Sequence, residues 1–526
     1  MVATGGYRLK RIFFDRLFQQ SYWTWRKHPA IIVPTMLGTG LSAIAQSIIT
    51  LAAIVVLTSF AVQNTLFDFL VTIRNQGLIQ TLQSPGYAAT ILPAAAIGVA
   101  ILAVALILGG GFVYSAEYAT YLEASNRDSA TFRSIIDNGS RTWKKMTWTL
   151  LLNTIITWGP LTAGLILLLQ TLPTTALTPQ GLAAFVASSY AFILLVGTSL
   201  FLSLFTLYTY AAVVVDNVSG IKAIRQSFHV ASHNLSLTFT YAVVRAIFQL
   251  LSTLIIVFAG FVGVPLTALA TAILSLLLTP VLHSTKTMIY YHAGPTIPEM
   301  PFTITDPIGN DLFRRLPRAA WAKTRTGLAE IARFLVNPRN LPFHAASLLA
   351  LIVGILLGEF VSNSGFKRFY LDELFYQPGQ LNPLLTQVIP PALGVDLFLH
   401  NWLVSIAAAL AGIGFAFPSF QIILFNGFIL GLITPLIPNL TMLLAILAPH
   451  GIIEIPAFVL AGSVGIKLGY ASILTRTRPG SESLEYLSLT LRQAVYIVIG
   501  LAPLFLIAGL IEADLTPIVA RMFGWT

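Results

Sequence analysis

Long, uninterrupted apolar runs recur along the whole chain of 526 residues and limit the folds that it can adopt. A helix needs roughly 20 apolar residues to cross a bilayer, whereas a membrane barrel shows short segments of alternating polarity. The runs lie near residues 31–60, 88–113, 146–170, 183–214, 236–258, 262–284, 344–362, 397–416, 420–437, 440–470 and 493–512. The sequence therefore predicts an all-α, polytopic transmembrane helical bundle of about eleven spans.

Charged residues are scarce, which supports the same class of protein. Only 10% of the residues are charged and 56% are hydrophobic, whereas an ordinary soluble domain is about 25% charged. The net charge of +10 is typical of cytoplasmic loops and lipid headgroup contact. We therefore expect the lipid bilayer, and no nucleic acid, as a partner. The absence of cysteine excludes disulfides, thiolate metal ligands and cysteine nucleophiles.

Basic and proline-rich segments divide the chain into four predicted parts. Residues 1–28 form a basic amphipathic segment at the membrane interface, and residues 29–291 form a six-span membrane domain. Residues 292–343 form a basic linker, and residues 344–526 form a five-span membrane domain. Because Lys and Arg concentrate on the cytoplasmic side, we expect the N-terminus and the linker inside the cell. The C-terminus is then outside, and the membrane is the plasma membrane.

The stretch APHGIIEIPAF places His450 and Glu454 one helical turn apart within an apolar run. Residues four apart share a helix face, and ionisable residues at membrane depth indicate a functional site. His400, Asn401 and Asn426 lie in neighbouring spans and complete a predicted intramembrane polar cluster. A structural lock of neutral groups and a proton or ion site both remain open as interpretations.

Metal binding and catalysis have less support from the residue pattern. His and Glu are legitimate zinc ligands, but the chain has no HExxH motif and no GxSxG nucleophile motif. We therefore predict no metal site, no cofactor and no catalytic residue. An intramembrane metal-dependent hydrolase is the minor alternative.

Three further acids, Glu359, Asp396 and Glu512, are predicted at the outer ends of their spans. With His450 and Glu454 deeper in the membrane, they would line a polar funnel that opens outward. Such a funnel is what a transporter or channel for an ion, a proton-coupled solute or a lipid requires.

Two glycine pairs, Gly427 with Gly431 and Gly465 with Gly469, have a spacing of four residues. Small residues at this spacing allow helices to pack closely in lipid. We predict these four glycines as helix-packing positions.

Two prolines, Pro449 and Pro456, lie on either side of His450 and Glu454. Proline removes a backbone hydrogen bond, and interrupted helices occur in membranes where the freed carbonyls are buried or face a cavity. The sequence predicts an interrupted helix near 449–456.

One arginine of the N-terminal half, Arg245, lies in the middle of an apolar run. An arginine at this depth needs a partner or a cavity. Asn153 and Gln46 are candidate neighbours, and no acid is evident from the sequence. We predict that Arg245 either contacts a headgroup or substrate, or packs and extends to the interface.

The C-terminal half resembles a known family through an ordered set of motifs: FLHN, FNGFILG, PHGIIEIPAFVLAGSVGIKLG and LIEADLTP. It is similar over about 344–520 to the stage II sporulation protein M family of integral membrane proteins. The family pattern falls on His400, Asn401, Asn426, Gly427, Gly431, Pro449, His450, Gly451, Glu454, Pro456, Ala457, Gly462 and Gly465. The resemblance implies a subunit that works with peptidoglycan-cutting partners and is not itself the hydrolase.

These observations lead us to expect a non-enzymatic scaffold or complex subunit in envelope or membrane remodelling. Protein partners or self-association in the membrane are expected with it. A transporter or channel that uses the polar funnel is the alternative. A dry cluster favours the scaffold, and a continuous wet path past His450 and Glu454 favours the transporter.

Overall fold

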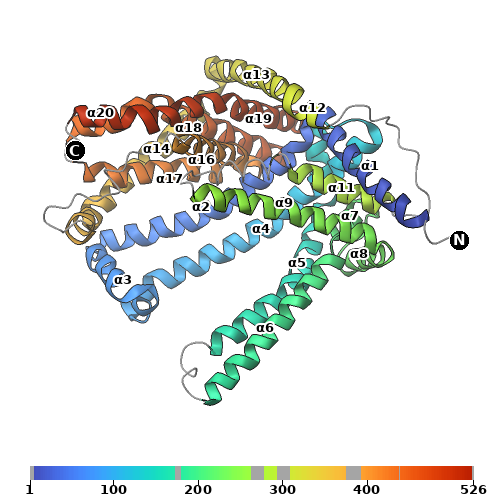
Figure 1. The fold of residues 1–526 in the computed structure, drawn as a ribbon. Helices are drawn as coiled ribbons and strands as arrows, with labels where there is room; N and C mark the ends of the chain where they lie inside the picture. Colours follow the sequence, from blue (N-terminus) through green and yellow to red (C-terminus); the bar gives the residue numbers. More distant parts are fainter. Residues whose placement is uncertain are drawn as a thin grey trace. The chain divides into compact units, whose positions relative to one another are not determined.

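The computed structural model describes residues 5–171, 179–261, 276, 278–292, 308–374, 392–437 and 439–523. Every element of these residues is helical (Figure 1), which confirms the all-α prediction. The chain forms two compact units that alternate along the sequence. Unit 1 comprises Met1–Thr35, Ile107–Ser252 and Ser275–Asp306, and unit 2 comprises Met36–Leu106, Thr253–Leu274 and Pro307–Thr526.

Unit 1 contains the basic N-terminal helix and most helices of the N-terminal half. Its elements are α1 (Gly5–Lys27), η1 (Pro29–Ile31), the second half of α4 (Pro85–Arg127), α5 (Phe132–Thr171), α6 (Pro179–Phe205), α7 (Thr209–Val215), α8 (Ile221–His233), most of α9 (Leu235–Phe261) and α11 (Thr279–His292). Helices α5 and α6 run side by side as a long pair (Figure 1). Helix α1 packs along α11. The apolar side of the amphipathic α1, including Leu17 and Trp25, is thereby buried in protein.

Unit 2 holds the helices of the C-terminal half together with α2 and α3. Its elements are most of α2 (Ile32–Val62), α3 (Leu66–Thr81), the first half of α4, α12 (Ile308–Asn310), η3 (Asp311–Arg315), α13 (Leu316–Val336), η4 (Pro338–Asn340), α14 (Leu341–Val361), η5 (Ser362–Phe366), η6 (Phe369–Leu374), α16 (Ala392–Leu410), η7 (Ala411–Ile413), α17 (Phe417–Ile433), η8 (Thr434–Leu436), α18 (Leu440–Thr477), α19 (Ser481–Leu510), η9 (Ile511–Leu515) and α20 (Thr516–Met522).

Nine helices of the described chain are long and apolar enough to cross a membrane, or ten if a bent pair counts as one span. That pair, Ile221–His233 with Leu235–Leu251, bends by 99°. Of the predicted apolar runs, 262–284 lies mostly outside the described residues. The count of about eleven is therefore approximate, and the polytopic membrane class is supported.

Helix α18 differs from the sequence-based expectation. It is continuous from Leu440 to Thr477, with Pro449 and Pro456 inside it, so the predicted interruption near 449–456 is wrong. A proline removes one backbone hydrogen bond but leaves the rest of the helix ladder intact. Neighbouring helices in a membrane protein support such a site.

The pair α14 and α17 is packed backbone to backbone at glycines. A Cβ atom at Gly431 would lie 2.0 Å from the Ile355 carbonyl oxygen, and one at Gly354 would lie 2.1 Å from the Leu424 carbonyl oxygen. The same obstruction exists at Gly427, where an added Cβ would meet a backbone carbonyl at 2.2 Å. Only a residue without a side chain fits at these positions, so the glycines set the distance between the helices.

The second predicted glycine pair lies on α18 and faces the chain around α16 and η7. An added Cβ would lie 2.1 Å from the Ala408 carbonyl oxygen at Gly465, and 2.2 Å from the Ala416 nitrogen at Gly469. Close approach at these two glycines therefore sets the distance between α18 and the end of α16 with the segment that follows it.

Helix α13 lies within the predicted linker, residues 292–343. It packs against α19 through Gly327, whose added Cβ would lie 2.5 Å from the Gly500 nitrogen. Glu330 accepts a hydrogen bond of 2.8 Å from the Gln493 amide. The opposite side of α13 is exposed and carries Trp321, which is 59% exposed.

The end of α4 is tied to the end of α1 by an exposed acid. Asp128 follows the last residue of α4 in the left-handed region, with φ of 52°, which Asp tolerates better than most residues. Its carboxylate accepts a hydrogen bond from Lys27 and another, 2.9 Å long, from His28. These two hydrogen bonds, the one from Lys27 first, lower the pKa of Asp128.

Candidate functional site

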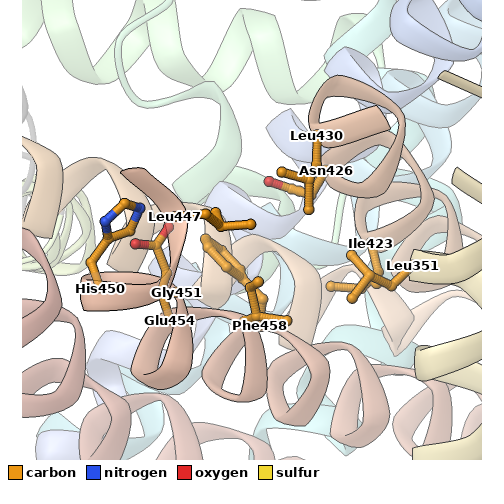
Figure 2. Close-up of a pocket in the computed structure, with 10 residues that line it drawn as sticks. Leu351, Ile423, Asn426, Leu430, Leu447, His450, Gly451, Glu454 and Phe458 are labelled. Carbon is orange, nitrogen blue, oxygen red and sulfur yellow. The ribbon is translucent and has the colours of Figure 1, made fainter. Parts of the chain in front are cut away.

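A pocket of about 130 Å³ lies in unit 2 between α14, α17 and α18 (Figure 2). Three polar residues, Asn426, His450 and Glu454, contribute to an otherwise apolar lining. A water needs roughly 10–15 Å³ of such space, whereas pockets for organic ligands are typically about 300–1,000 Å³. The pocket therefore suits a few waters or an ion and is too small for an organic solute.

Glu454 makes one hydrogen bond and leaves its other oxygen without a partner. Its Oε1 accepts a hydrogen bond of 2.9 Å from the Asn401 amide on α16. Its Oε2 is buried and has no hydrogen-bond partner among the described residues. A buried carboxylate oxygen without a partner is costly, so this atom marks a place where a ligand or a proton belongs.

His450 is held by a neighbour at the end of the chain rather than by Glu454. Its Nδ1 lies 3.2 Å from the Thr516 hydroxyl, and that hydroxyl donates to the Ile511 carbonyl at 3.2 Å. A hydroxyl has one proton to donate, so if Thr516 donates it to Ile511, Thr516 accepts from His450 and the imidazole proton is on Nδ1. The Nε2 atom of His450 then keeps its lone pair.

Glu512 joins these two residues from the π-helical segment η9. One ligand-type atom each from His450, Glu454 and Glu512 lies within 4.8 Å of the others. Glu512 has no hydrogen bond or ion pair to any residue that the structure describes. Figure 2 shows the His450 ring and the Glu454 carboxylate lying next to one another. Two acids and an imidazole therefore meet where α18 passes the end of α19.

The other sequence-predicted residues of this half are not among the three residues of the cluster. The side chain of His400 is exposed. The amide of Asn426 donates to the Ile422 carbonyl of its own helix at 2.7 Å, although the residue lines the pocket. Glu359 is exposed near the end of α14, and Asp396 is half-buried on α16. Of the three predicted outer acids, the structure brings only Glu512 to His450 and Glu454.

A second polar cluster, in unit 1, surrounds Glu117 of α4, which is 3% exposed. Its Oε1 accepts hydrogen bonds of 2.9 Å from Tyr121, 3.0 Å from His283 Nδ1 and 3.4 Å from Thr35. These donors come from three elements, so the acid ties α4 to α11 and to the start of α2. Sequence reasoning missed this site.

Two cations accompany Glu117. The Lys286 ammonium lies 5.1 Å from the centre of the Tyr118 ring and is attracted electrostatically by Glu117. Burial, followed by the charge of Arg245, lowers the pKa of Lys286 to about 7. Arg245 has an exposed side chain on α9 and acts electrostatically on this cluster. The sequence does contain a signal for this site. Glu117 lies within about one helical turn of the end of the apolar run 88–113, and Lys286 lies equally close to the end of the run 262–284.

The comparisons with known proteins concern the C-terminal region. No curated protein and no solved structure matches the chain at a significant level. The family model described as Stage II sporulation protein M matches residues 347–517. This range contains Asn401, His450, Glu454 and Glu512 and agrees with the resemblance drawn from the motifs. Residues 347–517 are thus similar to the stage II sporulation protein M family, and they lie within a longer, polytopic membrane chain.

Proposed function

We propose that the protein is a non-enzymatic membrane scaffold or complex subunit that acts in envelope or membrane remodelling. The observation that carries this proposal is the close packing of unit 2. Glycines bring α14 and α17 into backbone contact, and the pocket beside them has a volume of about 130 Å³. An organic solute or a lipid needs more room than this. The family match of residues 347–517 gives further support.

The surface that we propose for a partner is the exposed side of α13. It presents Trp321, Arg318 and Arg325 away from α19. Arginine and tryptophan are enriched where proteins bind other proteins. The partner is a membrane-associated subunit or a second copy of the chain.

Native gels of gently solubilised membranes test the scaffold. The chain of 57.0 kDa should migrate in a larger assembly, and Trp321→Ala with Arg325→Glu should release it. A matched control is Leu356→Ala, which truncates an exposed apolar residue of α14 and should leave the assembly intact. Migration as a single chain in wild-type membranes contradicts the proposal.

The second candidate is an ion or proton pathway, which the unpaired Oε2 of Glu454 favours. Proteoliposomes that contain a pH-sensitive dye separate the two functions. A scaffold passes no more protons than empty liposomes do. A proton flux that Glu454→Gln abolishes and Glu359→Gln preserves establishes the pathway instead.

We also propose a plasma-membrane location with α13 in the cytoplasm and the C-terminus outside. Because the chain has no cysteine, single substitutions report topology without background. A membrane-impermeant maleimide should label Met522→Cys in intact cells and Arg325→Cys only after permeabilisation. The reverse pattern overturns the orientation.

A further inference from the structure

We propose that His450, Glu454 and Glu512 bind a divalent transition-metal ion, with Zn²⁺ as the best match. No metal motif is visible in the sequence because the ligands come from separate segments: two lie one turn apart on α18, and the third lies on η9. Their ligand-type atoms are all within 4.8 Å of one another. Two ligands of a tetrahedral zinc are about 3.4 Å apart, so small side-chain rotations close the site.

The free atoms of the cluster are the ones that a metal requires. The carboxylate of Glu454 has one oxygen bound to Asn401 and the other, Oε2, buried without a partner. The Nδ1 of His450 is directed to Thr516, which leaves the lone pair of Nε2 for a ligand. Metal sites are commonly built in this way, with outer partners fixing the orientation and the protonation of the ligands.

The two carboxylates of the cluster also favour a bound cation. Glu454 and Glu512 are close enough to interact electrostatically. Among the described residues, neither acid forms an ion pair with Lys or Arg. A divalent ion neutralises two carboxylates at once, and three protein ligands leave a fourth position open to water. The adjoining pocket of about 130 Å³ has room for that water.

The ligand types select the metal. An imidazole suits zinc and its neighbours among the transition metals, whereas magnesium and calcium sites consist of oxygen ligands. One imidazole with two carboxylates is therefore expected to prefer Zn²⁺ to Mg²⁺. The ion would join α18 to the end of α19. This inference goes beyond the proposed scaffold role, which does not require a metal ion.

Zinc binding to the purified full-length chain in detergent tests the site after metal has been removed with a chelator. The exposed pair His229 and His233 on α8 offers a competing surface site, so titrations with ZnCl₂ use the His233→Ala background. We expect one zinc per chain, and millimolar MgCl₂ should not displace it. Cobalt in place of zinc should give the visible absorption of a low-coordinate site.

Substitutions identify the ligands. Glu454→Gln and Glu512→Gln should each weaken zinc binding by at least ~10-fold, and Asn401→Ala by roughly 10-fold through lost orientation. The matched control Glu359→Gln makes the same chemical change on α14 and should bind zinc as the parent does. Zinc should also raise the melting temperature of the parent and not that of the two Gln variants.

Three results overturn the proposal. One is the absence of saturable zinc binding in the His233→Ala chain. Another is equal affinity in Glu454→Gln, Glu512→Gln and Glu359→Gln. The third is that MgCl₂ displaces zinc and that His450→Gln does not change the affinity for zinc. If Glu454→Gln does not fold, Glu512→Gln near the end of the chain decides the question. If the scaffold assay fails but the chain still binds zinc, only the proposed scaffold function is contradicted.

Discussion

Glu117 in unit 1 and Glu454 in unit 2 are both acids on long apolar helices, but their surroundings differ. Glu117 accepts hydrogen bonds from Tyr121 and His283 and has Lys286 nearby. Glu454 has a single donor, Asn401, and an oxygen without a partner in the described chain. A satisfied buried acid holds helices together, whereas an unsatisfied one is a place for a ligand. The two units therefore place the same residue type in different hydrogen-bonding surroundings.

The largest effect is expected from Glu117→Ala. The substitution removes the shared acceptor of three side chains and leaves Lys286 buried without its anion. Breaking a buried ionic network in this way costs about 3–5 kcal/mol. The free energy of unfolding, followed by tyrosine and tryptophan signals in detergent, measures this loss. Unchanged stability would mean that the cluster is not what holds α4 to α11.

A smaller loss of stability is expected from Gly431→Ala. This substitution tests backbone contact in unit 2, whereas Glu117→Ala tests hydrogen bonding in unit 1. The new Cβ would lie 2.0 Å from the Ile355 carbonyl oxygen. Overpacking of this kind costs about 1–3 kcal/mol. The control is Gly414→Ala, where a Cβ meets nothing within 4 Å. Equal melting temperatures of the two variants would contradict the packing argument.

A still smaller loss is expected from Glu454→Gln in the metal-free protein. Glutamine keeps an acceptor for Asn401, and Oε2 has no bond to lose. Hydrogen bonds between membrane helices average about 0.6 kcal/mol, and we expect a change below ~1 kcal/mol. The same substitution at Glu117 should cost more. Similar unfolding free energies for the two Gln variants would remove the distinction between the clusters.

The smallest effect is expected from a substitution of Asp128. This acid is paired with Lys27 and His28 but is exposed, so it shows what pairing contributes without burial. The Lys27 and His28 hydrogen bonds lower the pKa of Asp128, so its contribution to stability is present above the unfolded pKa of about 3.9. The contribution is lost as the pH falls through the lowered folded pKa. Asp128→Asn should be slightly less stable than the wild type at neutral pH and equal to it in strong acid. A difference that persists in acid would exclude the ionic explanation.

Local sequence was sufficient for the helical class, the approximate span count and the family region. Apolar runs and motifs such as PHGIIEIPAF are read within one segment, and a spacing of four places His450 and Glu454 on one helix face whatever the rest of the chain does. The same local reading failed at Pro449 and Pro456. Proline weakens a helix locally, and neighbouring helices decide whether it breaks.

Tertiary structure alone decided which polar residues meet. His283 reaches Glu117 across 166 positions of sequence, and Asn401 reaches Glu454 across 53. Glu512 joins His450, while Glu359 and His400 remain exposed. Sequence fixes the face of a helix on which a side chain lies, because that depends on residues a few positions away. The helix that this face contacts depends on packing between distant segments, and it is this contact that makes a polar residue either a structural tie or a candidate ligand.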